Sequence, residues 1–171
     1  QTCALPIFFQ QQIDLIQNSG IATAMVGLLE AIPGTQLYER LKRERRLVET
    51  DTSGDNADGT TNIITCMNLE VLQEGYKNVM RHLYSPEHYY QRVKTFLREY
   101  KPPAIKHHVD VDRVLAFLRS IVHLGILGKG RLQYWKLLIW TSLRRPRLLP
   151  VSVELLIFGY HFRKMCEARL R

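Results

Sequence analysis

Hydrophobic and polar positions change their period twice in the first part of the chain. Apolar side chains recur at helical spacing over Phe8–Asn18, and they do so again over Thr35–Arg46. Between them, Ala22–Leu29 is an apolar run without a charged residue, which is typical of a strand covered on both faces. Pro33 and Gly34 then form a turn signal. Helix, strand, turn and helix in this order predict a βα step of a barrel or of a doubly wound sheet.

Helical patterns dominate the rest of the chain. Polar residues fill Glu49–Gly59, which predicts a loop, and Thr60–Thr65 is a short β-like run. Two amphipathic helices follow, one capped by Asn68 and one opened by Ser85 and Pro86. Further helices are expected over Val111–Leu124, Leu132–Leu143 and Val151–Leu170.

Positive charge is concentrated in the last third of the chain. Residues 1–104 hold 11 Lys and Arg against 12 Asp and Glu, whereas residues 105–171 hold 13 against 4. The change falls just after Pro102 and Pro103, so we place a boundary near Ala104. Three explanations stay open for the basic region: solvated helix faces, contact with an anionic membrane surface near Trp135 and Trp140, and binding to nucleic acid. No nucleic-acid recognition motif accompanies the charge, so nucleic acid is not expected as a partner.

Composition and cysteine spacing bound the class of protein. The 171 residues suffice for one core with a small annex, and 46% hydrophobic with 23% charged residues is typical of a folded chain. Cys3, Cys66 and Cys166 are widely spaced, which argues against a disulfide framework and a zinc ribbon and favours a reducing, cytoplasmic setting. We find no secretory signal and no apolar run of membrane-spanning length.

The first seven residues have a different origin in our interpretation. Gln1–Ile7 has the sequence that a common sequencing adapter gives when it is translated in one frame, and Phe8 fits the adapter's final base. We therefore interpret residues 1–7 as an artefact and leave them out of the fold prediction. We expect the natural chain to begin upstream of Phe8.

Glu30 and the polar loop that follows residue 49 are the candidates for chemistry. Glu30 ends the predicted strand, where barrel and sheet enzymes bind their ligands, and it is either a ligand-binding carboxylate or a solvated loop acid. Gly27 leaves room for a flat heterocycle against the backbone of residues 27–31. The residues that we expect to line a substrate pocket are Asp55, Asn56 and Asn62. The loop lacks the spaced oxygen ligands and the closing Glu of a calcium loop, so no metal site is expected.

Several short motifs follow one another in an order that resembles a known enzyme family. The first are Ser19-Gly20-Ile21, Gly27-Leu28-Leu29, Ala31, Pro33-Gly34-Thr35 and Leu37-Tyr38. The later ones are Gly54-Asp55-Asn56, Asn62, Met67, Gly75-Tyr76, Leu83-Tyr84-Ser85-Pro86, Tyr89-Tyr90 and Arg92. As an ordered set over Phe8–Pro103, they resemble the C-terminal part of cobalamin-binding radical S-adenosylmethionine (SAM) enzymes. In that family, a cobalamin domain and a radical barrel precede a helical domain of unknown function, and the hopanoid methylases are similar members.

The resemblance implies a fold and a SAM contact. We expect an α/β fragment, the last βα step of a partial TIM-type barrel, followed by a mainly α-helical C-terminal domain. The predicted domains are the end of the barrel (8–48), an accessory domain with a loop, a short strand and two helices (49–103), and a basic helical region (104–171). The family's last strand lies against the adenine of SAM. That contact maps onto Gly27, Leu28, Leu29, Glu30 and Ala31.

Two parts of the family pattern are missing. The 4Fe–4S cluster of radical SAM enzymes needs the spacing C-x-x-x-C-x-x-C, which cysteines at positions 3, 66 and 166 do not provide, and the cobalamin domain is missing too. We therefore expect a C-terminal fragment that has no catalytic residue and binds no cofactor alone. The parent enzyme would bind SAM, a 4Fe–4S cluster and cobalamin, cleave SAM reductively and transfer a methyl group to an unactivated carbon.

The expected partner is the rest of the parent enzyme. A peripheral membrane contact through the basic C-terminal helices is a further expectation. The alternative function is a non-catalytic basic helical module that docks on a membrane surface or on a partner protein.

Overall fold

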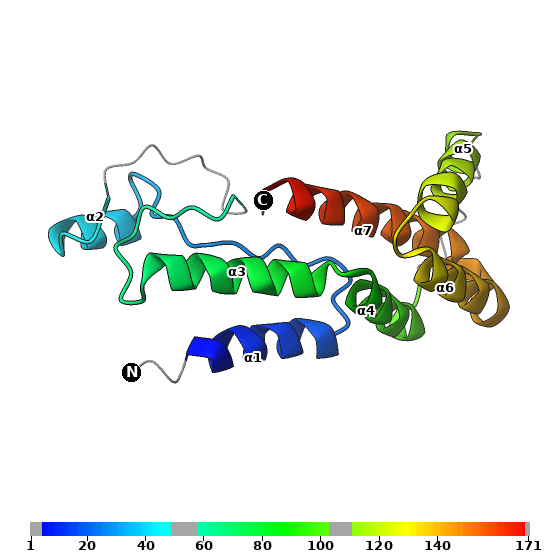
Figure 1. Ribbon diagram of the computed structural model, residues 1–171, viewed down its shortest axis with the longest axis horizontal. Helices are drawn as coiled ribbons and strands as arrows, with labels where there is room; N and C mark the ends of the chain where they lie inside the picture. Colours follow the sequence, from blue (N-terminus) through cyan, green and yellow to red (C-terminus); the bar gives the residue numbers. More distant parts are fainter. Residues whose placement is uncertain (1–4, 49–57, 103–110, 170–171) are drawn as a thin grey trace.

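The computed structural model describes residues 5–48, 58–102 and 111–169, which form a bundle of helices and one extended segment (Figure 1). In chain order the helices are α1 (Leu5–Asn18), α2 (Gln36–Arg43), α3 (Leu69–Leu83), α4 (Pro86–Glu99), α5 (Val111–Ser120), η2 (Ile121–Ile126), α6 (Arg131–Arg144), η3 (Pro146–Leu148) and α7 (Leu149–Arg169). Residues 21–32, which we call the extended segment, run between α1 and α2. The predicted boundary near Ala104 and the loop residues Asp55 and Asn56 lie outside the described residues.

The helices predicted from the sequence are confirmed, with shifted ends. α2 stops at Arg43 because Arg45 takes a left-handed backbone conformation, with φ of 53°. α5 continues directly into η2, a π-helix in which the N–H of Leu127 bonds to the carbonyl of Val122. A short 3-10 turn, η3, precedes α7.

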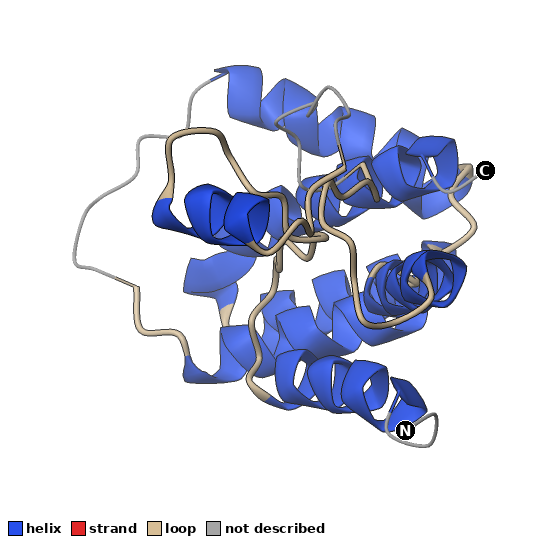
Figure 2. Cartoon of the chain, turned by 90° about the vertical axis from the view of Figure 1, so that its left-hand side faces the viewer, coloured by secondary structure: helices blue, strands red, loops and turns tan. Residues whose placement is uncertain are grey.

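The predicted α/β fold class is wrong. Ala22–Leu29 is extended, but it pairs with no other strand among the described residues, and Figure 2 shows helices and loops without a strand. A strand requires a neighbour for its backbone groups, and the described chain supplies none. In the β-like run Thr60–Thr65, one isolated antiparallel bridge joins Ile63 to Leu47.

α4 lies at the centre of the bundle and packs against α1, α3, α6 and α7. Val93 and Leu97 on its inner face are completely buried. The helices approach closely where glycines face aromatic rings, since Gly159 of α7 lies against the ring of Tyr89 and Gly75 of α3 against that of Phe9. The bundle thus supplies a rigid base along which the extended segment lies.

Candidate functional site

Hydrogen bonds from side chains hold the first half of the extended segment in place. In a sheet, bonds to neighbouring strands would do this. Arg92 of α4 donates from Nε to the carbonyl oxygen of Ile21 at 3.1 Å and from Nη2 to that of Ala22 at 3.5 Å. Tyr84, just after α3, donates its hydroxyl to the carbonyl oxygen of Ala24 at 2.6 Å. Since both donors are buried in the bundle, they fix the course of the extended segment.

Burial affects the ionisation of both donors. It raises the pKa of the Tyr84 hydroxyl, although the hydrogen bond to Ala24 opposes this shift. It lowers the pKa of the Arg92 guanidinium, which faces carbonyl oxygens and lies 5.5 Å from the centre of the Tyr89 ring. A raised pKa keeps the Tyr84 hydroxyl protonated at neutral pH, so that it acts as a donor.

Asn62 holds the other end of the extended segment. Its Oδ1 accepts from the N–H of Ala31 at 2.8 Å, and its Nδ2 donates to the Ala31 carbonyl oxygen at 2.9 Å. Asn62 and Ala31 are 4% and 0% exposed, so one buried amide satisfies both backbone groups of Ala31. Next to this pair, Thr61 donates its hydroxyl to the carbonyl oxygen of Leu29 at 2.7 Å.

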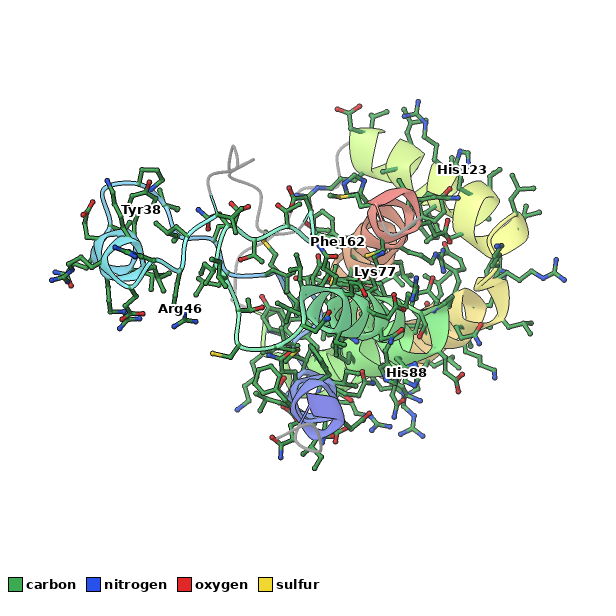
Figure 3. The ribbon with its side chains drawn as sticks, turned by 60° about the vertical axis from the view of Figure 1, so that its left-hand side comes forward. Tyr38, Arg46, Lys77, His88, His123 and Phe162 are labelled. Carbon is green, nitrogen blue, oxygen red and sulfur yellow. The ribbon has the colours of Figure 1, made fainter. Side chains whose placement is uncertain are left out.

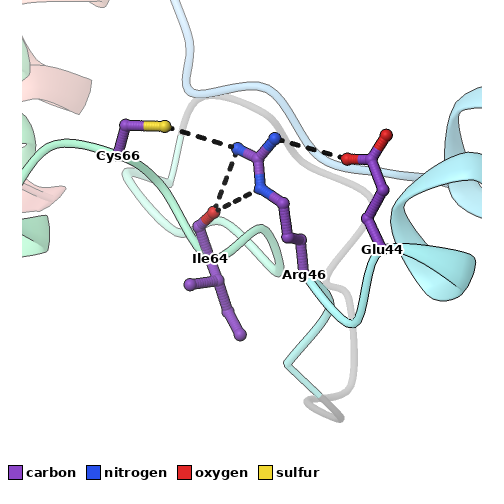
Figure 4. A network of polar contacts seen from close by, with 4 residues as sticks. All are labelled: Glu44, Arg46, Ile64 and Cys66. Carbon is purple, nitrogen blue, oxygen red and sulfur yellow. Dashed lines mark hydrogen bonds and ion pairs between the residues drawn. The ribbon is translucent and has the colours of Figure 1, made fainter.

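Arg46 links the residues that follow Asn62 to the end of α2. Its Nε and Nη2 donate to the carbonyl oxygen of Ile64 at 3.3 and 3.2 Å, and its Nη1 lies 3.5 Å from the Glu44 carboxylate (Figure 4). Nη2 also lies 3.9 Å from the sulfur of Cys66. These contacts keep Asn62 in position beneath the extended segment.

Glu30 has a buried carboxylate that is incompletely paired. The residue is 5% exposed, and its Oε1 lies 3.1 Å from the Thr60 hydroxyl. The same hydroxyl lies 2.6 Å from Asp58 Oδ1, and because it has one proton it serves one carboxylate at a time. Oε2 of Glu30 is buried and has no hydrogen-bond partner in the part of the chain that the structure describes. An N–H or O–H donor from a ligand would satisfy it.

The backbone of the extended segment keeps open hydrogen-bonding capacity. The N–H groups of residues 23–30 donate in none of the hydrogen bonds between described residues. Met25 is 89% exposed and Leu29 is 62% exposed, whereas Leu28 is buried, which is the alternation of a strand. An extended backbone with free donors and exposed apolar side chains is suited to pairing with another segment.

The structure brings part of the predicted site together. Gly27–Ala31 form one continuous extended stretch, in which Gly27 and Leu29 are exposed and Leu28, Glu30 and Ala31 are buried. Asn62 joins them, and both polar atoms of its side chain are engaged with Ala31. No role in the site was predicted for Thr60, Thr61, Tyr84 and Arg92, although Tyr84 and Arg92 belong to the ordered motifs.

The described residues form a further pocket outside the predicted site. A pocket between the end of α3 and α7 is lined by residues that include Arg81, Tyr84 and Arg163, none of which was predicted as a site residue. Within the described ranges, no three His, Cys, Asp or Glu side chains cluster closely enough to hold a metal ion. Among the same residues, every helix is too short or too polar to cross a membrane.

Comparison with known proteins gives one family and two relatives. The family model "Domain of unknown function (DUF4070)" matches residues 35–171. A hopanoid C-2 methylase of Rhodopseudomonas palustris is 28% identical over 140 residues, which cover 77% of this chain and 25% of that protein. An uncharacterised methyltransferase of Synechocystis is 26% identical over 152 residues, which cover 85% of this chain and 28% of that protein.

The chain therefore spans about a quarter of the length of the curated relatives that it matches. No solved structure matches it. The matches confirm the resemblance, drawn above from the ordered motifs, to the C-terminal part of cobalamin-binding radical SAM enzymes.

Proposed function

We propose a function from one premise: this chain belongs to the DUF4070 family, whose model matches it over residues 35–171. We propose that it is an accessory part of a cobalamin-dependent radical SAM methyltransferase. The whole enzyme cleaves SAM reductively and transfers a methyl group to an unactivated carbon. The names of the two relatives, a methylase and a methyltransferase, support methyl transfer as the reaction.

The incompletely paired carboxylate of Glu30 is the observation that carries this proposal. It lies at the end of the stretch Gly27–Ala31, where exposed Gly27 and free backbone N–H groups suit a flat heterocycle. These residues fit SAM: the backbone of Gly27–Ala31 would face the adenine, and Glu30 would accept a hydrogen bond from the ligand. SAM bound there would supply the radical on reductive cleavage, cobalamin in the rest of the enzyme would carry the methyl group, and this chain would supply binding and orientation.

The other cofactors do not fit this chain. Cys66 is exposed and Cys166 is buried, and neither stands in the spacing that a 4Fe–4S cluster needs. We place the cluster and cobalamin in the remaining part of the parent enzyme. That part is also the partner we propose for the open backbone of the extended segment, which Tyr84 and Arg92 hold against the bundle.

The first test is the gene sequence upstream of the Phe8 codon. A reading frame that continues into a C-x-x-x-C-x-x-C motif and a cobalamin domain supports the proposal. A start codon directly before Phe8 contradicts it and favours the alternative, a basic helical module without catalytic activity.

The second test uses Glu30→Gln in the complete enzyme. The amide keeps the shape but removes the charge, so we expect SAM to bind about ten times more weakly or worse, since a hydrogen bond to a charged group contributes about 1.5–3 kcal/mol. The matched control is Glu74→Gln, which removes an exposed carboxylate on α3. Calorimetric titration with SAM measures the difference, and equal affinity of the Glu30→Gln and wild-type enzymes would contradict the assignment.

A further inference from the structure

α5, η2 and α6 expose apolar stripes to water. On α5 and η2 the exposed apolar residues include Val111, Leu115, Leu118, Val122 and Ile126, and on α6 they include Leu132, Trp135, Ile139 and Leu143. Both sets recur every three or four residues, which places each set along one side of its helix. We call these nine residues the apolar face. Single exposed apolar residues are ordinary, but stripes on neighbouring helices mark a surface that contacts something.

η2 and α6, which carry parts of the two stripes, are in direct contact. Trp135 donates its indole N–H to the carbonyl oxygen of Gly125 at 3.0 Å, and the rings of Tyr134 and Trp135 pack against Gly125. Trp135 belongs to the α6 stripe, and Gly125 directly precedes Ile126 of the other stripe. Trp135 of the α6 stripe therefore contacts η2 directly beside Ile126 of the other stripe.

This face lies at the end of the molecule that is opposite α2 and the candidate site. Figure 1 shows α5 and α6 at one end and α2 at the other. Figure 3 shows the same separation from another direction, with Tyr38 of α2 and His123 of η2 on opposite sides. The apolar face is thus separate from the open backbone of the extended segment.

Positive charge is concentrated in the same stretch of chain as the apolar face. Residues 111–147 hold eight Lys and Arg and one acid, Asp112. Exposed Arg119, Lys136 and Arg144 each follow a residue of the apolar face directly in the sequence. The ion pairs between described residues lie elsewhere, at Glu44–Arg46, Glu74–Arg81 and Lys164–Glu167. Among the described residues, Arg119, Lys136 and Arg144 therefore take part in no ion pair and can face an anionic partner.

We propose that the apolar face docks on the surface of an anionic lipid membrane, with α5, η2 and α6 lying in its interfacial plane. The apolar side chains enter the boundary between head groups and acyl chains, and the neighbouring Arg and Lys side chains bind lipid phosphates. Charge complementarity favours lipid, because a large apolar surface flanked by eight cations and one acid matches the acyl chains and the anionic head groups of a bilayer. This docking does not depend on the proposed enzymatic function.

Tryptophan fluorescence of the full chain provides the test. Trp140→Phe leaves Trp135 as the reporter, since the chain has two tryptophans. With vesicles of phosphatidylcholine and phosphatidylglycerol at low ionic strength, we expect blue-shifted emission that brominated lipids quench. With phosphatidylcholine alone, or in about 0.5 M salt, binding should weaken at least about tenfold because the electrostatic attraction is absent or screened.

A second variant separates the apolar face from charge alone. The triple variant Leu132→Ser, Ile139→Ser and Leu143→Ser keeps every cation, and we expect it to bind anionic vesicles at least about a hundredfold more weakly. The control variant Leu15→Ser, Leu69→Ser and Val71→Ser removes exposed apolar side chains from α1 and α3 and should bind like the wild type. Circular dichroism verifies that both variants fold.

Three results would overturn the proposal. The first is absence of binding to anionic vesicles at low ionic strength. The second is unchanged binding of the Leu132→Ser triple variant, which would assign the attraction to charge alone. The third is a dimer in solution that buries Trp135 and does not bind vesicles, which would make the apolar face a contact between copies of this chain.

Discussion

At the scale of the residue, one amide takes the place of a paired strand. Asn62 satisfies the N–H and the carbonyl of Ala31 at once, with bonds of 2.8 and 2.9 Å in a buried position. The geometry requires a donor and an acceptor side by side, which Asn provides and Asp does not.

Asn62→Asp should therefore destabilise the chain although it preserves the shape of the side chain. The new carboxylate oxygen would face the Ala31 carbonyl without a proton between them, and we expect a loss of about 2–4 kcal/mol in the free energy of unfolding. Urea denaturation at pH 7 measures it. Asn78→Asp on the exposed face of α3 is the control, and an equal effect of both changes would contradict the role of Asn62.

Buried tyrosines make the free energy of unfolding depend on pH in the alkaline range. Burial, reinforced by Tyr134 and opposed by Arg163, raises the pKa of Tyr90 to about 12. Between pH 10 and 12 the unfolded chain has lost the Tyr90 proton while the folded chain keeps it. The unfolded state binds fewer protons there, so stability falls as the pH rises through this window.

Tyr90→Phe should flatten that decline by up to about 1.4 kcal/mol for each pH unit, since the variant has no proton to lose at this position. Urea denaturation between pH 8 and pH 11 gives the slopes. Tyr38→Phe on α2, where the tyrosine is partly exposed, is the comparison. If wild type and Tyr90→Phe decline in parallel, the linkage to Tyr90 is wrong.

At the scale of the element, the sequence predicts the structure that local signals determine. The helices have local signals: apolar spacing, and caps such as Thr35, whose hydroxyl oxygen accepts from the N–H of Tyr38, and Asn68, which accepts from that of Glu70. Ala22–Leu29 has the local pattern of a strand and is in fact extended, but a strand exists only with a neighbour. The pattern could not show that the described chain supplies none.

The same distinction applies to the candidate site. Glu30 could be selected from its place after an apolar run. Its contact with Thr60 and the bond from Arg92 to Ile21 join residues 30 and 71 positions apart, which no local pattern reveals. Arg92 and Tyr84 could be noticed in their motif, but their role as donors to the extended segment follows only from the fold.

Close packing between helices gives a prediction for α4 and α7. A methyl group on Gly159 would collide with the ring of Tyr89, which is 2% exposed and is held by a hydrogen bond of 2.6 Å from its hydroxyl to the Leu155 carbonyl. We expect Gly159→Ala to cost about 1–3 kcal/mol, more than the gain of about 1 kcal/mol from better helix propensity.

A double-mutant cycle measured by urea denaturation tests this prediction. In the background Tyr89→Leu the ring is absent, so Gly159→Ala should become neutral or stabilising there. If Gly159→Ala costs the same in both backgrounds, the contact between Gly159 and the ring does not determine the packing of α4 against α7.

At the scale of the whole molecule, Arg92 connects the parts that a sheet would otherwise join. It is completely buried on α4, and it donates to Gln17 of α1 at 3.1 Å as well as to Ile21 and Ala22 of the extended segment. A planar guanidinium can bond to all three acceptors because its N–H groups diverge in one plane. The position of the extended segment on the bundle, and with it the place of Glu30, depends on this residue.

Arg92→Lys should therefore destabilise the attachment of the extended segment to the bundle. A single ammonium group cannot reach the three acceptors together, so we expect the free energy of unfolding to fall by about 2–4 kcal/mol.

Hydrogen exchange should accelerate in residues 17–31 while α6 and α7 stay protected, because Arg92 makes no hydrogen bond to either helix among the described residues. Arg81→Lys, in an exposed ion pair with Glu74, should change stability by less than about 0.5 kcal/mol. Uniformly faster exchange along the whole chain would instead mean that Arg92 stabilises the entire bundle and does not specifically hold the extended segment.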